Sequence, residues 1–224
     1  MIFELAVFHP DSVAIAQACN VSRIELCDNY AVGGVTPSKD NFIAARKIFE
    51  GPIMVMIRPR AGDFICDDDL INQMVEEIKA FDNLGADGFV FGCLNSNKSV
   101  NASQLERLIQ SANKKHVTFH RAIDEVNDYE QGLQDLIKCG VKSVLTTGKM
   151  KSALEGKGVI NQMINKYGNQ LNFIAGGGVR SSNISELLLN SNINQIHSAA
   201  ITQKENFIAD EEEVRKIIEI VNYA

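Results

Sequence analysis

The sequence lacks a long apolar run, a block of basic residues and a leader pattern at its N-terminus. A membrane-spanning helix needs about 20 consecutive apolar residues, and no stretch approaches this length, so we expect no membrane association. The formal net charge of −6, from 22 basic and 28 acidic residues, argues against a nucleic-acid-binding protein. Residues Met1–Glu4 show no basic segment or cleavage site, so we expect no export signal and a cytoplasmic location.

The five cysteines also lack a recognisable spacing. They stand at positions 19, 27, 66, 93 and 139, which form neither a disulfide framework nor a CxxC motif. A reduced protein is therefore expected. The composition, 45% hydrophobic and 22% charged, is typical of a soluble globular protein and names no function.

Apolar segments of strand length alternate with amphipathic segments of helical length along the whole chain. The predicted strands are Phe3–Phe8, Arg23–Asp28, Pro52–Arg58, Gly88–Leu94, Val117–Ala122, Ser143–Gly148, Leu171–Gly176 and Ile193–Ser198. The predicted helices are 11–19, 39–49, 68–84, 102–112, 128–138, 157–166, 183–190 and 210–222. Eight such units in 224 residues correspond to about 28 residues each, close to a minimal βαβ repeat.

The alternation predicts an α/β fold, a single (β/α)8 barrel of the TIM type over residues 1–224, because no linker or low-complexity tract interrupts it. An open, doubly wound sheet is the competing fold. That fold usually has a glycine-rich loop after its first strand, whereas the first loop here is Phe8–Asp11.

Residues that tolerate a left-handed backbone mark the predicted helix ends. A glycine or asparagine in this conformation closes a helix shortly before the next strand begins. The residues expected to do so are Asn20, Gly85, Gly140 and Asn192. Helix starts are predicted at Asp67, at Asn101 or Ser103, and at Asp210.

Alternation within the strands separates residues that face the helices from residues that face the barrel axis. Apolar residues such as Phe3, Leu5 and Val7 are expected to face the helices, which turns the residues between them inward. The same rule applied to five strands gathers polar side chains in the interior: Glu4, Glu25, Arg58, His120 and His197. Barrel interiors are ordinarily filled with branched apolar residues, so charges there are costly unless they are paired or used.

Two interpretations of this inward group stay open. Glu4, Glu25 and Arg58 could form a structural ion network that binds no ligand. Alternatively, the group is a functional site, because several members close their strands and the C-terminal mouth of a barrel carries its chemistry.

Three loops at the predicted mouth add groups suited to an anionic ligand. Arg58 and Arg60 offer forked donors for a carboxylate or phosphate. The candidate catalytic residues are Glu4, Glu25, Arg58, Arg60, His120 and Asp124. The candidate anion-binding residues, in a glycine-rich turn before a helix and on the strand beside it, are Gly176, Gly177, Gly178, His197 and Ser198.

Nine motifs, in order along the chain, carry a resemblance. They are Arg23–Cys27, Gly33–Ser38, Met56–Arg60, Gly62–Phe64, Gly85–Gly88, Val90–Gly92, Val117–Ala122, Ala153–Gly156 and Gly176–Val179. They resemble the CutC family, which is named for copper homeostasis, from residue 4 to about residue 200. The resemblance implies a cytoplasmic, often oligomeric α/β barrel linked to copper handling, with no firmly assigned reaction.

The resemblance also implies a copper(I) site built on cysteine. Some members have a thiol in the first strand as well as the one that corresponds to Cys27, close enough to hold one Cu(I) between them. Here the first-strand position is Ala6, and one thiolate alone is a poor Cu(I) site. Cys66, Met54 or Met56 could supply a second soft ligand.

Two hypotheses of different classes follow. The first is a copper-homeostasis protein that binds metal through Cys27. The second is a barrel enzyme of the lyase, isomerase or hydrolase type that acts on a small anionic or phosphorylated metabolite. A weaker third is an Mg²⁺ or Mn²⁺ enzyme in which Glu4, Glu25, Asp124 and His120 bind the ion. Whether the chain is an enzyme, and whether it forms a homo-oligomer, stay open.

Overall fold

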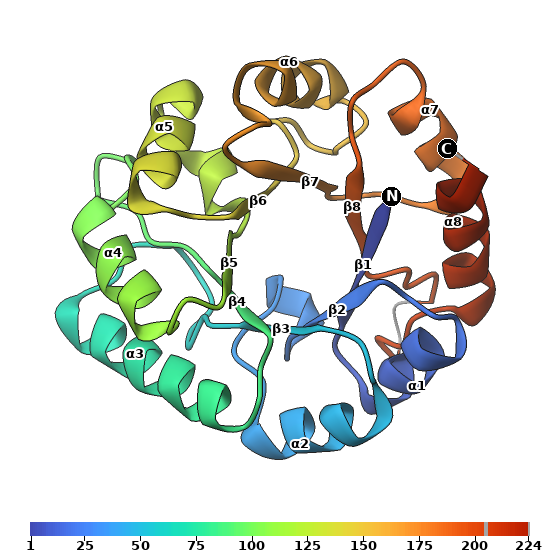
Figure 1. Cartoon of the computed structure of the whole chain (residues 1–224), viewed down its shortest axis with the longest axis horizontal. Coiled ribbons are helices and arrows are strands. Elements are labelled where there is room, and N and C mark those ends of the chain that lie inside the picture. Colours follow the sequence, from blue (N-terminus) through green and yellow to red (C-terminus); the bar gives the residue numbers. More distant parts are fainter. Residues whose placement is uncertain (204–205, 224) are drawn as a thin grey trace.

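The computed structural model describes residues 1–203 and 206–223 and shows a closed barrel (Figure 1). The strands pair in parallel in chain order, and β1 closes against β8. They are β1 (Ile2–Val7), β2 (Arg23–Leu26), β3 (Ile53–Met56), β4 (Gly88–Phe91), β5 (His116–Phe119), β6 (Ser143–Thr146), β7 (Asn172–Gly176) and β8 (Gln195–Ser198).

A ring of helices surrounds the strands (Figure 1). They are α1 (Pro10–Ala18), α2 (Lys39–Ile48), α3 (Asp68–Asn83), α4 (Ala102–Ser111), α5 (Tyr129–Cys139), α6 (Lys157–Tyr167), α7 (Ser181–Leu188) and α8 (Glu211–Tyr223). Two short 3-10 helices, η1 (Tyr30–Val32) and η2 (Arg121–Glu125), follow β2 and β5. The predicted α/β barrel of the TIM type is confirmed.

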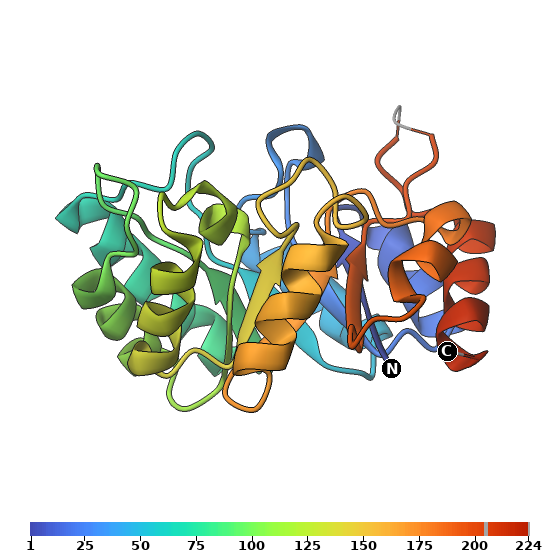
Figure 2. The ribbon, with the colours of Figure 1, turned by 90° about the horizontal axis from the view of Figure 1, so that it is seen from above.

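The loops that follow the strands rise on one side of the barrel, and the two termini lie on the other (Figure 2). The side with these loops is the C-terminal mouth, where the active sites of such barrels lie. None of the helices in the described ranges combines the length and the apolar character needed to cross a bilayer.

Three of the four predicted helix ends are confirmed. Asn20, Gly85 and Gly140 have φ values of 55°, 92° and 86°. The prediction for Asn192 was wrong, because α7 ends at Leu188 and Asn190 takes the left-handed conformation, with φ 52°. Asn192 instead links to α6, where its backbone and side-chain amides bond the side chains of two asparagines.

The predicted helix starts are also confirmed. The side chain of Asp67 accepts a hydrogen bond from the backbone of Leu70, and Asn101, rather than Ser103, caps α4 in the same way. Asp210 accepts from the backbone N–H groups at the start of α8. Each cap satisfies donors that the first helical turn leaves free.

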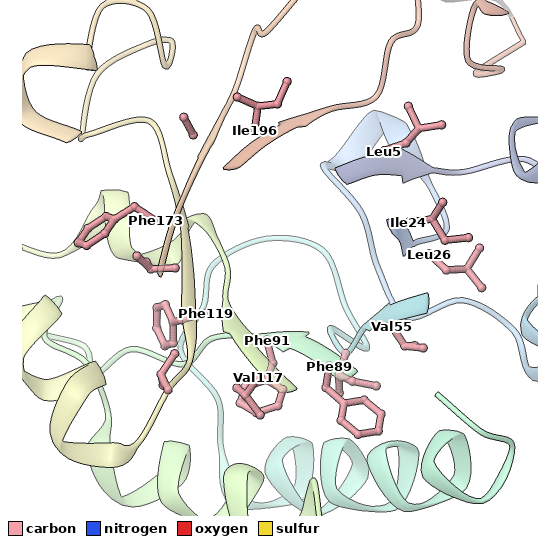
Figure 3. Close-up of a cluster of buried hydrophobic side chains, with 14 of the residues drawn as sticks. Leu5, Ile24, Leu26, Val55, Phe89, Phe91, Val117, Phe119, Phe173 and Ile196 are labelled. Carbon is pink, nitrogen blue, oxygen red and sulfur yellow. The ribbon is translucent and has the colours of Figure 1, made fainter. Parts of the chain in front are cut away.

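The apolar core lies between the strands and the helices. The helix-facing side chains drawn in Figure 3 include Leu5, Ile24, Val55, Phe119 and Ile196, all buried in one continuous cluster. A second, smaller cluster lies inside the barrel and consists of Cys27, Met54, Met56 and Val90, with Phe8 packed against it. The alternation predicted for the strands is therefore correct.

The approach of α6 to β6 requires a glycine. An ideal Cβ on Gly156 would lie 1.7 Å from the carbonyl oxygen of Thr147, whereas a Cβ on Gly158 would have no atom within 4 Å. We expect Gly156→Ala to lower the free energy of unfolding by about 3 kcal/mol through this collision. Gly158→Ala, in the helix itself, should raise it by about 0.5–1 kcal/mol. Urea unfolding of both variants measures the difference, and equal effects would contradict the geometry.

Candidate functional site

The mouth of the barrel contains a cavity of about 250 Å³, a volume suited to a small metabolite. Its lining residues come from seven of the eight strands or from the loops that follow them. The lining includes Ala6, Glu25, Cys27, Met56, Arg58, Phe64, His120, Arg121, Gly177, Gly178, Arg180, His197 and Ser198.

A row of charged side chains leads from the barrel interior to this cavity. Arg23 Nε donates to Glu4 Oε2 over 2.5 Å, and Glu4 Oε1 lies 2.8 Å from His197 Nδ1. His197 Nε2 lies 3.6 Å from Glu25 Oε2. Neighbouring strands supply this row, since Glu4 pairs in register with both Arg23 and His197.

Burial and the neighbouring charges shift the pKa of Glu4, Glu25 and His197 in this row. Burial alone would raise the pKa of Glu4, but the Arg23 charge and the His197 hydrogen bond lower it to about 2. Burial raises the pKa of Glu25 to about 7, against the opposing charge of His197. Burial alone would lower the pKa of His197, but its bond to Glu4 and the charge of Glu25 raise it. Glu4 is therefore a fixed anion, and Glu25 exchanges its proton near neutral pH.

One oxygen of Glu25 has no partner. Glu25 is 2% exposed, and its Oε1 makes no hydrogen bond within the described residues, although the Cys27 thiol lies close enough to the carboxyl group to lower its pKa slightly. Glu4, in contrast, uses both oxygens. An unpartnered buried polar atom costs about 1–3 kcal/mol, so this end of the row is not a closed structural network.

Arg58 and Arg60 were both expected to bind an anion at the mouth, but their guanidinium groups hydrogen-bond the loops instead. Arg58 lines the cavity, but its guanidinium donates to the carbonyl oxygens of Val32, Gly34 and Gly62 over 2.7–3.0 Å. Arg58 thus ties together the loops that follow β2 and β3. Arg60 does not line the cavity, and its guanidinium bonds Asp63 and loop carbonyls in its own loop.

Asp124 likewise organises a loop. Its carboxylate accepts from the Thr146 hydroxyl over 2.6 Å and from the backbone N–H groups of Thr147 and Lys149. It also pairs with Arg121, whose Nε lies 3.3 Å from Asp124 Oδ2. The carboxylate does not line the cavity, whereas Arg121 does.

The glycine turn after β7 meets the cavity at two of its three residues. Gly177 and Gly178 have φ values of 98° and 75°, and both line the cavity. Gly176 ends β7 and packs against His197, where a Cβ would lie 3.1 Å from the His197 Cβ. The Arg121 guanidinium lies against Gly177, since a Cβ there would be 3.6 Å from Arg121 Cζ.

The hydroxyl group of Ser198, beside this turn, already makes hydrogen bonds within the protein. Its hydroxyl donates to the Val179 carbonyl over 2.7 Å and accepts from the Ala200 N–H and from Arg180. Arg180 also donates to the carbonyl oxygens of Val179 and Ile201. Arg121 therefore has more donors free for a ligand than Arg180.

The structure groups the hard metal-binding candidates differently from the sequence. Glu4, Glu25 and His197 offer ligand atoms within 4.8 Å of one another. Asp124 and His120 do not join them in the described part of the chain. Because Arg23 already pairs with Glu4, and His197 Nδ1 bonds it, much of this group's charge is balanced from within.

Arg23 and Arg121 are the residues that sequence reasoning left out of the site. Arg23 stands two residues before Glu25 in the same strand, so alternation places both on the inward face. Arg121 follows His120 at the strand end, where the rule of alternation stops and only the loop conformation determines its direction.

The CutC family matches residues 1–202 of the chain. The chain belongs to this family. The family protein CutC of Pasteurella multocida is 39% identical over 197 residues, which cover 88% of this chain and 81% of that protein. A copper homeostasis protein cutC homolog of Caenorhabditis elegans is 36% identical over 204 residues, which cover 91% of this chain and 82% of that protein.

Solved structures agree with this assignment. A CutC protein from Streptococcus agalactiae is similar with a TM-score of 0.84 at 27% identity, covering 89% of this chain and 98% of that one. KGPDC from Streptococcus mutans is similar with a TM-score of 0.66 at 14% identity, covering 99% of this chain and 97% of that one. At that identity the second likeness concerns the fold alone.

The raised pKa of Glu25 makes the stability of the CutC barrel depend on pH. Between its ordinary value of 4.5 and about 7, the folded protein keeps a proton that the unfolded chain has released. The free energy of unfolding therefore falls as pH rises through this interval. We expect Glu25→Gln to reduce the loss between pH 5 and pH 8 by about 1–3 kcal/mol.

Urea unfolding at the two pH values measures this effect. Glu76→Gln is the control, because Glu76 is 73% exposed on α3 and its charge is solvated in both states. An unchanged difference between pH 5 and pH 8 in Glu25→Gln would contradict the assignment of the proton to Glu25.

Proposed function

We propose that this CutC chain is an enzyme that binds a small anionic metabolite in the mouth cavity and transfers a proton with Glu25. The observation that carries the proposal is the unpartnered Oε1 of Glu25, buried at the cavity beside His197. A carboxyl group whose pKa lies near 7 serves as either acid or base at neutral pH. Glu4 would fix the direction of the His197 ring, and Arg23 would hold Glu4 ionised.

The anionic part of the ligand would bind at Gly177, Gly178 and Arg121. The N–H groups of both glycines have no acceptor among the described residues, and both glycines line the cavity. Backbone N–H groups of a glycine turn together with a guanidinium form a suitable site for phosphate or carboxylate. This subsite replaces the pair Arg58 and Arg60, whose terminal guanidinium nitrogens donate within the loops, although Arg58 Nε has no partner among the described residues.

Inorganic phosphate is the simplest probe of the subsite. We expect it to bind, and Arg121→Gln to weaken it about 10-fold or more, because a charge-assisted hydrogen bond contributes about 1.5–3 kcal/mol. Isothermal titration in low salt measures the dissociation constant. Arg107→Gln is the matched control, since Arg107 lies on α4 and pairs with Asp68 outside the cavity. Absence of phosphate binding to the unmodified protein would contradict the proposal.

Copper(I) fits the cavity less well. Burial and the neighbouring Glu25 raise the pKa of the Cys27 thiol well above its usual range, while the thiolate is the form that binds Cu(I). Ala6 lines the cavity without a ligand atom, and Cys66 lies outside it. Met56 alone adds a thioether at the cavity wall. The residues present therefore do not form the two-thiol site that the family resemblance implies.

Restoring the second thiol tests this conclusion. We expect weak Cu(I) binding that Cys27→Ser leaves unchanged, and a gain of about 100-fold or more in Ala6→Cys, because two thiolates replace one. Competition with a Cu(I) chelator under reducing conditions measures the Cu(I) affinity of the unmodified protein and of each variant. The double variant Ala6→Cys, Cys27→Ser should lose the gain. Tight binding to the unmodified protein that Cys27→Ser abolishes would support copper as the ligand instead.

A further inference from the structure

The imidazole of His120 presents a buried hydrogen-bond donor that nothing in the described protein uses. His120 follows β5, lines the mouth cavity and is 4% exposed. Its Nδ1 accepts a hydrogen bond from the backbone N–H of Ala122 over 3.2 Å. A backbone N–H only donates, so Nδ1 carries the lone pair and the proton of the neutral ring is on Nε2.

The surroundings keep this ring neutral. Burial and the charge of Arg58 lower the pKa of His120 to about 3. Arg58 stacks on Phe64, with its Cζ 4.9 Å from the ring centre, and the Phe64 ring lies 4.7 Å from the His120 ring. His120 is thus a donor through Nε2 at neutral pH and does not act as a cation.

The donor belongs to a set of unpartnered polar atoms on inward positions. His120 Nε2, Thr118 Oγ1 and Glu25 Oε1 are all buried and make no hydrogen bond within residues 1–203 and 206–223. Each such atom costs about 1–3 kcal/mol when it is left unpaired. His120 follows β5 and Glu25 lies on β2, and both line the cavity, so these two polar groups reach it from different parts of the wall, whereas Thr118 lies deeper on β5.

We propose that Nε2–H of His120 binds the carbonyl oxygen of the substrate and that Glu25 removes a proton from the carbon next to that carbonyl. The inference rests on the proposed function and specifies it: the substrate is a small ketone or aldehyde that carries a phosphate or carboxylate. A neutral imidazole suits this role, because it stabilises a developing oxyanion without having to give up its proton.

The step is balanced without a cofactor. The Glu25 carboxylate takes the proton, and the electron pair of the broken C–H bond forms a C=C bond. The carbonyl π electrons move to the oxygen, which becomes an enolate oxygen held by His120 Nε2–H. Where the carbon that lost the proton carries a hydroxyl group, the proton of that hydroxyl passes to the enolate oxygen and the hydroxyl oxygen becomes the new carbonyl oxygen. The C=C electron pair then takes the proton back from Glu25 at the former carbonyl carbon, which completes an isomerisation. Nothing is oxidised or reduced overall.

The first test needs no ligand. Nitrogen-15 NMR of the histidine rings distinguishes the two neutral tautomers from the cation. We expect His120 to be neutral at pH 7 with its proton on Nε2. A cationic ring, or a proton on Nδ1, would overturn this inference and leave the proposed function intact.

The second test uses 2-phosphoglycolate, whose carboxylate mimics the enolate, against ethyl phosphate, which has no such group. We expect 2-phosphoglycolate to bind the unmodified protein about 10-fold tighter or more, because of the charge-assisted hydrogen bond from Nε2. His120→Phe should abolish this preference while ethyl phosphate binds unchanged. His120→Gln, which keeps an N–H donor, should retain part of it, and the His120 Nε2 signal should shift on binding.

The outcomes separate the two proposals. If ethyl phosphate binds but the preference for 2-phosphoglycolate is absent, or persists in His120→Phe, the role of His120 is wrong and the anion subsite stands. If neither compound binds the unmodified protein, both proposals fail. Circular dichroism of each variant shows whether it is folded, and the tautomer measurement on the unmodified protein is independent of any variant.

Discussion

The burial of four ionisable side chains in one row is the constraint on which the rest of the site depends. Arg23, Glu4, His197 and Glu25 lie in a region of low dielectric, where each isolated charge would be strongly unfavourable. Arg23 balances Glu4, and Glu4 in turn favours a proton on His197. Glu25, at the other end of the row, shares His197 with Glu4. Burial therefore raises the pKa of Glu25, whereas the pKa of Glu4 is lowered despite its burial. The closed register of β1 with β2 and β8 holds the row in place.

The arginines at the mouth differ in how many of their donors are used. Arg58 and Arg180 hydrogen-bond the surrounding loops, whereas in the described part of the chain most donors of Arg121 are free to bind a ligand. Arg58 donates to three loop carbonyls, and Arg180 donates to loop carbonyls and to Ser198. These bonds fix the two walls between which a ligand would enter. Arg121 is half exposed, and among the described residues its guanidinium makes one 3.3 Å contact, with Asp124, so most of its donors stay available. The anion site that we propose would benefit from this division, because fixed walls reduce the ordering that binding requires.

The sequence was informative about the barrel and its interior and less so about its loops. Strand alternation depends only on the pleat, so it placed Glu25 and His197 correctly on the inward face. The direction of a loop side chain depends instead on which carbonyl or amide lies within reach. For this reason Arg60 and Asp124, which look like site residues beside their motifs, lie outside the cavity and stabilise loops. Asn192 shows the same limit, because either of two nearby asparagines could have closed α7.

Position 6 connects the family resemblance to the chemistry of this chain. Ala6 pairs in register with Glu25, and both line the cavity. A thiolate at this position would place a second negative charge beside the Glu25 carboxylate and Cys27, and a bound cation would be needed to balance them. With alanine there is no such charge, and a proton on Glu25 suffices. The residue at position 6 thus sets the charge beside Glu25, and under the proposed function alanine favours an exchangeable proton there over a metal ion.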